Sequence, residues 1–181
     1  VVLHVGSCKG STEDESIERI GAGIAEALEA APGDCCVFLE NTAGAGDTIG
    51  RTFAQLRRVA DAVGAPERLA FCLDTQHLFA SGYPVHEPGG IDRVLEEFDR
   101  EIGTDRLRCL HLNDSKVGFG SNRDRHENLG DGEIGPDGMR HILGCPDLQG
   151  LPVILEVPGA DGKGPDADNM ARARRFHEEG L

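Results

Sequence analysis

The chain has 181 residues, of which 28% are charged and 39% hydrophobic, and its formal net charge is −14. This length suffices for one domain with a hydrophobic core, and we expect residues 1–181 to form a single domain. No stretch approaches the roughly 20 apolar residues of a membrane-spanning helix, so we expect no membrane partner. The negative charge weighs against a nucleic-acid partner, because phosphate backbones attract basic surfaces. Bound metal would offset part of that charge.

The segments that we predict as strands are, in chain order, Val1–Ser7, Cys36–Asn41, Leu69–Thr75, Leu107–Asn113 and Pro152–Val157. They are apolar without clean polar alternation, which is typical of parallel strands buried on both faces. The first segment begins at Val1 as if a strand were already under way, which we interpret as a sign of missing upstream sequence.

Amphipathic segments separate these strands and predict helices. In chain order they are Ser11–Ala31, Thr48–Val63, Gly90–Ile102, Asp137–Leu143 and Asp166–Glu179. The first opens on an acidic run, which suits a helix N-terminus, and then places Ile17, Ile20 and Ile24 on one face. Five β–α units in succession predict an α/β fold with a parallel sheet and helical crossovers. No repeat or linker divides the chain.

The six cysteines are Cys8, Cys35, Cys36, Cys72, Cys109 and Cys145. Four of them lie in or beside apolar strand-like runs, where a free thiol packs as a small hydrophobic group. No Cys-x-x-Cys pair indicates a redox motif or a zinc knuckle. We therefore expect reduced thiols and a cytoplasmic protein.

Every predicted strand carries a side chain that can bind a metal near its carboxyl end. These residues are His4, Glu40, Asp74, His111 and Glu156. In a parallel sheet or barrel those ends face one side, where active sites assemble. Each residue alone is more often a helix cap, a loop anchor or a satisfied core histidine. Together the carboxylates would repel one another and be costly to desolvate, so a bound cation is the simplest compensation.

Two further pairs strengthen the prediction of a metal centre. Asp74 and His77 lie three residues apart just past a strand, and Asp124 and His126 lie in the polar loop after the His111 strand. A mixture of histidine and carboxylate ligands suits zinc or manganese better than magnesium. The number of ligands favours two or three metals, and adjacent metals are typical of phosphoryl hydrolysis.

Six stretches of the chain resemble the endonuclease IV family of apurinic/apyrimidinic DNA-repair endonucleases. They occur in the family's order and extend over nearly the whole chain: Leu3–Ser7, Leu39–Gly44, Leu73–Tyr83, His111–Lys116, Arg123–Gly130 and Ile154–Glu156. The resemblance implies a TIM (β/α)8 barrel with a trinuclear zinc centre, in which manganese could replace zinc. It also implies double-stranded DNA containing abasic sites as substrate, and a monomer at full length.

The resemblance also implies a role for each matching residue. His4 resembles a ligand of the first zinc, and Glu40 a carboxylate that bridges the first and second. Asp74, His111 and Glu156 resemble ligands of the second zinc, and His77, Asp124 and His126 those of the third. We expect Glu40 and Glu156 to be catalytic as well. The implied reaction is attack by a metal-bound hydroxide on the phosphate 5′ to an abasic site. Among the basic residues, the candidates for phosphate contact are Lys116, Arg123 and Arg125.

The chain departs from the family pattern in two places. Gln76 stands where the family usually has cysteine between the threonine and histidine of the third motif. The family barrel also has three more strands upstream, which carry a further histidine ligand. We therefore expect only the C-terminal five β/α units of a barrel, with weak activity on their own, because five strands cannot close one.

Two alternatives stay open. A metal-dependent sugar isomerase or epimerase of the xylose-isomerase-like barrel class also places carboxylates and histidines at successive strand ends, usually for one or two metals. The third set of ligands, His77, Asp124 and His126, argues against it. The other alternative is a metal-binding fragment without catalytic activity.

Overall fold

Five parallel strands form the central sheet of the computed structural model, which describes residues 1–31, 33–64 and 66–181. Their order across the sheet follows the chain: β1 (Val2–His4), β2 (Val37–Glu40), β3 (Leu69–Asp74), β4 (Leu107–His111) and β7 (Val153–Ile154). Each lies within a segment predicted as a strand, so the parallel α/β prediction is confirmed. The sheet is open, because β1 and β7 each pair with one described strand only.

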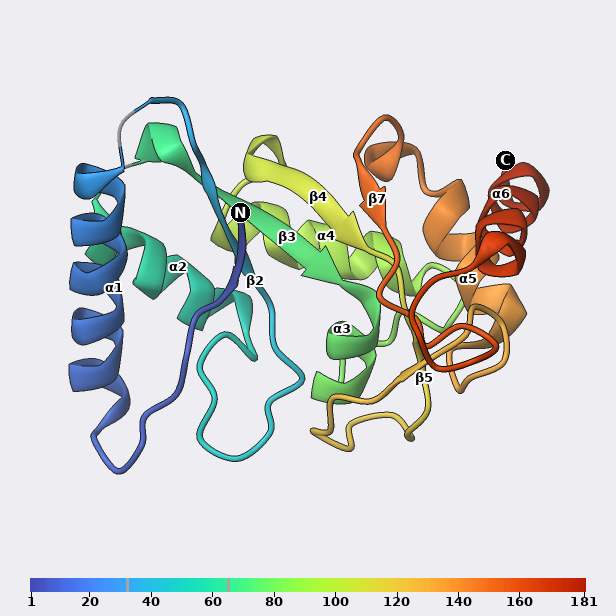
Figure 1. Ribbon diagram of the computed structural model, residues 1–181, viewed down its shortest axis with the longest axis horizontal. Coiled ribbons are helices and arrows are strands. Elements are labelled where there is room, and N and C mark those ends of the chain that lie inside the picture. Colours follow the sequence, from blue (N-terminus) through green and yellow to red (C-terminus); the bar gives the residue numbers. More distant parts are fainter. Residues whose placement is uncertain (32, 65) are drawn as a thin grey trace.

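Helices follow the strands, and Figure 1 shows them behind the sheet and at its two ends. They are α1 (Glu13–Ala30), α2 (Phe53–Val63), α4 (Gly90–Glu101), α5 (Gly135–Gly144) and α6 (Ala167–Gly180). A capping box of Thr12 and Glu15 starts α1. The helix predicted from Thr48 begins only at Phe53, because Thr52 caps it and Gly50 before it has a φ of +96°.

Several short elements were not predicted. Helix α3 (Thr75–Ser81) starts directly after β3, and two short antiparallel strands, β5 (Asp114–Ser115) and β6 (His126–Glu127), pair after β4. Single 3-10 turns η1 (Pro66–Arg68), η2 (Thr104–Arg106) and η3 (Pro146–Leu148) precede β3, β4 and β7. All are too short to leave a readable hydrophobic period in the sequence. No helix within the described ranges is long and apolar enough to cross a membrane.

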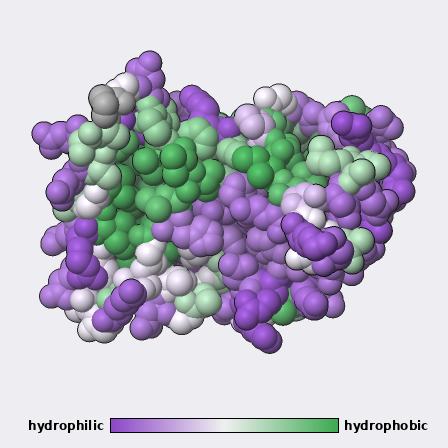
Figure 2. Space-filling view, in the orientation of Figure 1, coloured by the Kyte–Doolittle hydropathy of each residue, from purple (hydrophilic) through white to green (hydrophobic). Residues whose placement is uncertain are grey.

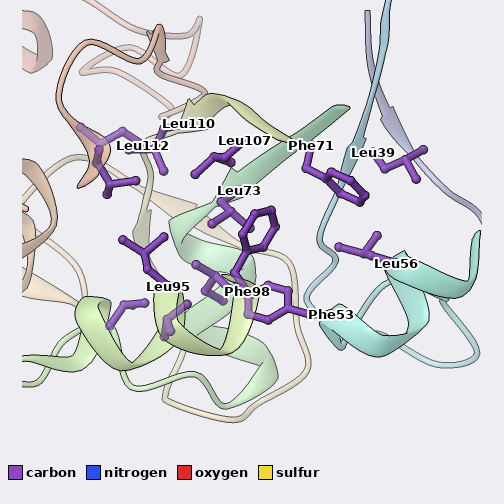
Figure 3. Close-up of a cluster of buried hydrophobic side chains, with 14 of the residues drawn as sticks. Leu39, Phe53, Leu56, Phe71, Leu73, Leu95, Phe98, Leu107, Leu110 and Leu112 are labelled. Atoms are coloured by element: carbon purple, nitrogen blue, oxygen red, sulfur yellow. The ribbon is translucent and has the colours of Figure 1, made fainter. Parts of the chain in front are cut away.

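The hydrophobic core lies between the sheet and its helices. Figure 3 shows Phe53 of α2, Phe71 of β3 and Phe98 of α4 meeting there, and all three side chains are fully buried. Helices α1 and α2 approach closely at Gly21, where a Cβ atom would lie 2.5 Å from the Cβ atom of Ala62. A layer of closely packed helices thus covers one face of the sheet.

The other face of the sheet carries both apolar and polar side chains. Figure 2 shows apolar areas over the strands and a polar area at their carboxyl ends. Among the apolar residues, Val153 and Ile154 of β7 are 39% and 45% exposed, and Phe38 of β2 is partly exposed. The polar area is where the predicted metal ligands lie.

Candidate metal centre

Glu40 is the central residue of the polar cluster. It ends β2, is 2% exposed, and reaches histidines from three other elements. Its Oε2 atom lies 2.9 Å from Nε2 of His4, and its Oε1 atom lies 2.8 Å from Nδ1 of His111 and 3.6 Å from Nδ1 of His77. The predicted convergence of strand ends β1, β2 and β4 on one carboxylate is therefore present in the structure.

Asp74 and His77 are brought together by the junction of β3 and α3. Asp74 ends the strand and caps the helix, because its Oδ1 atom accepts a hydrogen bond of 2.8 Å from the backbone N–H of His77. Nδ1 of His77 lies 2.9 Å from the carbonyl oxygen of Asn41. Since a carbonyl only accepts, Nδ1 carries a proton, and Nε2 is the nitrogen that would bind a cation once it has lost its own proton.

His126 and Asp124 come from the loop and strand β6 that follow β5. The Asp124 carboxylate lies between two imidazoles, 3.4 Å from Nε2 of His77 and 3.3 Å from Nε2 of His126. Both Nε2 atoms are buried without a hydrogen-bond partner among the described residues. Unpartnered buried nitrogens that face a carboxylate are costly, and a cation between them would satisfy all three groups.

Glu156 follows β7 and lies at the edge of the cluster, beside His111 and His126. Its Oε2 atom lies 3.1 Å from Nδ1 of His111, and its carbonyl oxygen lies 3.2 Å from Nδ1 of His126. The side chain is 44% exposed, unlike that of Glu40. Glu156 is therefore a partly exposed carboxylate beside His111.

The predicted ligands fall into groups whose donor atoms all lie within 4.8 Å of one another. They are His4, Glu40 and His77; Asp74, His77 and His126; and Glu40, Asp74, His111 and Glu156. Asp124 adjoins the second group through its contacts with His77 and His126. The donors are imidazole nitrogens and carboxylate oxygens, which fits zinc and manganese.

The electrostatics of the cluster keep Glu40 and Asp124 ionised. Burial alone would raise the pKa of Glu40, but hydrogen bonds from His111 and His4 hold that pKa at about 2. The imidazoles of His126 and His77, 3.3 and 3.4 Å away, likewise hold the pKa of Asp124 below its usual range. Burial would lower the pKa of His77, yet Asp74, Asp124 and Glu40 raise it to about 10. Without a cation, protons on the imidazoles compensate the carboxylates.

Cation binding should therefore release protons. A cation needs neutral imidazole, whereas the raised pKa of His77 keeps that ring protonated at neutral pH. Apparent zinc affinity should rise with pH up to the pKa of about 10 and fall on acidification. Calorimetric titration with zinc at pH 7 in two buffers of different ionisation enthalpy measures this release. Binding heats that are equal in the two buffers would contradict it.

Two asparagines hold the ligands in place, a role that the sequence did not reveal. Nδ2 of Asn113 donates to Asp74 at 2.6 Å, and its Oδ1 accepts the backbone N–H of Glu156 at 2.8 Å. The Asn41 side chain bonds both backbone groups of Asp74. Both asparagines are buried. Asn41 immediately follows the predicted ligand Glu40, and Asn113 lies two residues after the predicted ligand His111. Their positions just after two predicted strands were the sequence signal that could have indicated this supporting role.

The basic candidates lie on the loop between β5 and β6. Lys116, Arg123 and Arg125 are all exposed, and the backbone N–H of Lys116 donates to the carbonyl of Arg125. Their contact with phosphate stays a prediction. Gln76, the departure in the third motif, donates from Nε2 to the Ser115 hydroxyl and the Arg123 carbonyl, so it ties this loop to α3.

Comparison with known proteins agrees with this geometry. The family model described as "Xylose isomerase-like TIM barrel" matches residues 1–179. A "Probable endonuclease 4" of Methanoculleus marisnigri is 43% identical over 177 residues, which are 97% of this chain and 62% of that protein. A protein of the same description from Trichlorobacter lovleyi is 39% identical over 96% of this chain.

Solved structures give the same result. Endonuclease IV from Thermus thermophilus has a TM-score of 0.81 and 36% identity, covering 99% of this chain and 61% of that one. A D-tagatose 3-epimerase-like protein has a TM-score of 0.65 at 18% identity, covering 100% and 61% of the two chains, which shows a shared fold alone. The chain thus spans about 62% of the length of the curated relatives that it matches. The resemblance to endonuclease IV is confirmed, as is the TIM-barrel class, and the chain belongs to the xylose isomerase-like TIM-barrel family.

Proposed function

We propose that this chain supplies the metal centre of a DNA-repair endonuclease that hydrolyses the phosphodiester bond 5′ to an abasic site in double-stranded DNA. The observation that carries the proposal is the convergence of His77, Asp124 and His126, in which two buried Nε2 atoms, unpartnered within the described part of the chain, face one carboxylate. An isomerase that binds one metal ion would not need this further set of metal ligands. The names of the relatives, which are endonucleases 4, support the same interpretation.

We propose three zinc ions, each held by one part of the cluster, with manganese as a substitute. His4 and Glu40 would hold the first, Asp74, His111 and Glu156 the second together with Glu40, and His77, Asp124 and His126 the third. Bound there, the cations would supply an activated water and neutralise charge that develops on the phosphate and the leaving oxygen.

The chain's own residues would orient the substrate and keep the ligands ionised. The pKa of Glu40 at about 2 keeps it a carboxylate throughout the neutral range, so it can be shared between two cations. Glu156, being partly exposed, is the second residue to which we assign a catalytic role. Lys116, Arg123 and Arg125 would contact phosphates from the loop beside the centre. A single incomplete barrel domain, a cytoplasmic location and a monomeric full-length protein stay predictions.

The test combines metal analysis with two activity measurements on the purified chain. Elemental analysis counts the bound metal, and a duplex with one abasic site is compared with the same duplex undamaged. About three zinc ions together with slow cleavage of the damaged strand to a 3′-hydroxyl is the expected result, since five β/α units do not close a barrel. EDTA should abolish cleavage only after prolonged incubation, because buried ligands release metal slowly.

Two outcomes would overturn the proposal. A single bound metal together with ketose–aldose exchange would identify a sugar isomerase or epimerase. Bound zinc without either activity would identify a metal-binding fragment without catalytic function.

A further inference from the structure

Two buried cysteines lie directly beneath the carboxylate cluster. Cys72 of β3 and Cys109 of β4 are register partners in the parallel sheet and are 0% and 3% exposed. Each lies two residues before a predicted ligand, Asp74 and His111, which are register partners as well. Because side chains alternate along a strand, each cysteine points to the same face of the sheet as the ligand that follows it.

The cysteines and His111 form a compact set of donor atoms. The two Sγ atoms and a ring nitrogen of His111 all lie within 4.8 Å of one another. All three residues are buried. This set contains two sulfur donors and no carboxylate, in contrast to the groups around Glu40. Sulfur donors select soft cations such as Cu(I) and Cd(II), whereas carboxylates do not.

We propose that Cys72, Cys109 and His111 form a separate site for a thiophilic d10 cation, with Cd(II) and Cu(I) as the matching ions. Binding converts two thiols to thiolates, and their protons pass to the solvent. The positive charge of the cation then compensates two buried negative charges. Among the described residues, the Cys72 thiol has one partner beyond this pair, the Leu73 carbonyl at 4.0 Å, so a cation displaces little existing hydrogen bonding.

The sheet face that carries the thiols is accessible nearby. A cavity of about 500 Å³ lies along it toward the amino ends of the strands, and its lining includes Ala70 of β3 and Arg108 of β4. Ala70 is two residues before Cys72 on the same strand and Arg108 is the residue before Cys109. The cavity therefore lies on the side of the cysteine pair away from the carboxylate cluster, although neither cysteine lines it.

Occupation of this site has a consequence for the neighbouring centre. Nδ1 of His111 lies 2.8 Å from Glu40 and 3.1 Å from Glu156, so His111 belongs to both sets of donors. A soft cation that draws His111 toward the sulfurs removes a ligand from the carboxylate group. This competition rests on the proposed hydrolytic function, whereas the thiolate site itself does not.

The experiment is a Cd(II) titration of the metal-free chain carrying Cys8→Ser, Cys35→Ser and Cys36→Ser, which removes the three cysteines that are not buried. We expect the ultraviolet thiolate-to-cadmium charge-transfer band to saturate at the amplitude of two thiolates per chain, because the carboxylate groups that also take Cd(II) give no such band. Cys109→Ala and Cys72→Ala, each added to that background, should weaken the Cd(II) affinity read from the band at least about tenfold. Cys145→Ala, the matched buried cysteine, should leave the band unchanged.

The 113Cd NMR shift of the same background chain identifies the donor atoms without any further substitution. The donors can therefore be assigned even if a cysteine-to-alanine variant fails to fold. A shift typical of two sulfur ligands is expected. A shift typical of nitrogen and oxygen ligands alone, a missing charge-transfer band, or a Cd(II) affinity in Cys109→Ala equal to that of the background chain would overturn the site. None of these readouts requires nuclease activity, so failure of the proposed function and failure of this site are distinguishable.

Discussion

Glu40→Gln should lower incision of abasic DNA by several orders of magnitude in a full-length protein. The amide has nearly the same shape but no negative charge, while the carboxylate that it replaces reaches His4, His77 and His111 at once. Loss of the charge removes a shared ligand and leaves cations without compensation. Rates on a duplex with one abasic site, together with zinc content, measure the effect.

Glu133→Gln is the matched control for this substitution. Glu133 is exposed on the loop after β6, and only its backbone N–H, which donates to the Ser115 carbonyl, has a described partner. It should keep wild-type rates and metal content. Incision by the Glu40 variant at the wild-type rate would show that Glu40 is not part of the metal centre and would refute its assignment as a bridging carboxylate.

Asp114→Ala should destabilise the chain strongly, by more than about 3 kcal/mol. Asp114 is 0% exposed, and its two carboxylate oxygens accept backbone N–H groups from Ser115, Gly130, Gly132, Ile134 and Gly135. The carboxylate therefore organises the loop from β6 to α5. Its removal leaves several buried donors unsatisfied, each of which costs about 1–3 kcal/mol. The free energy of unfolding in urea measures the loss.

Asp131→Ala changes a residue of the same loop but leaves the buried hydrogen bonds of Asp114 intact. Asp131 is exposed and forms a surface ion pair of 2.7 Å with Arg172. Such pairs contribute about 0–1 kcal/mol, so this variant should unfold close to the wild type. Equal stability of the two variants would show that the Asp114 network does not hold the loop.

The strand-end ligands could be predicted because their signal is local. His4, Glu40, Asp74 and His111 each end an apolar run, and the geometry of parallel sheets then brings such ends to one edge. The parallel arrangement of the five strands followed from β–α alternation, because each helix returns the chain to the same end of the sheet. No long-range information was needed for either.

The support of those ligands depends on contacts that no local pattern encodes. Asn113 joins Asp74 of one strand to the backbone of Glu156, which lies 43 residues further along the chain. The β5–β6 ladder, which presents His126, consists of two-residue strands joined by a polar loop. Helix α3 has seven residues, so its amphipathic period is not legible before the fold is known.

The overlap among the groups of donor atoms has a thermodynamic consequence. Glu40, Asp74 and His77 each belong to two groups of the carboxylate cluster, so no group can fill without fixing side chains of the next. A first cation orders ligands that a second would otherwise have to order itself, while a shared carboxylate screens the repulsion between them. If cations fill these groups, occupation of neighbouring positions would therefore be coupled, and by linkage the loss of one ion would change the affinity for those beside it.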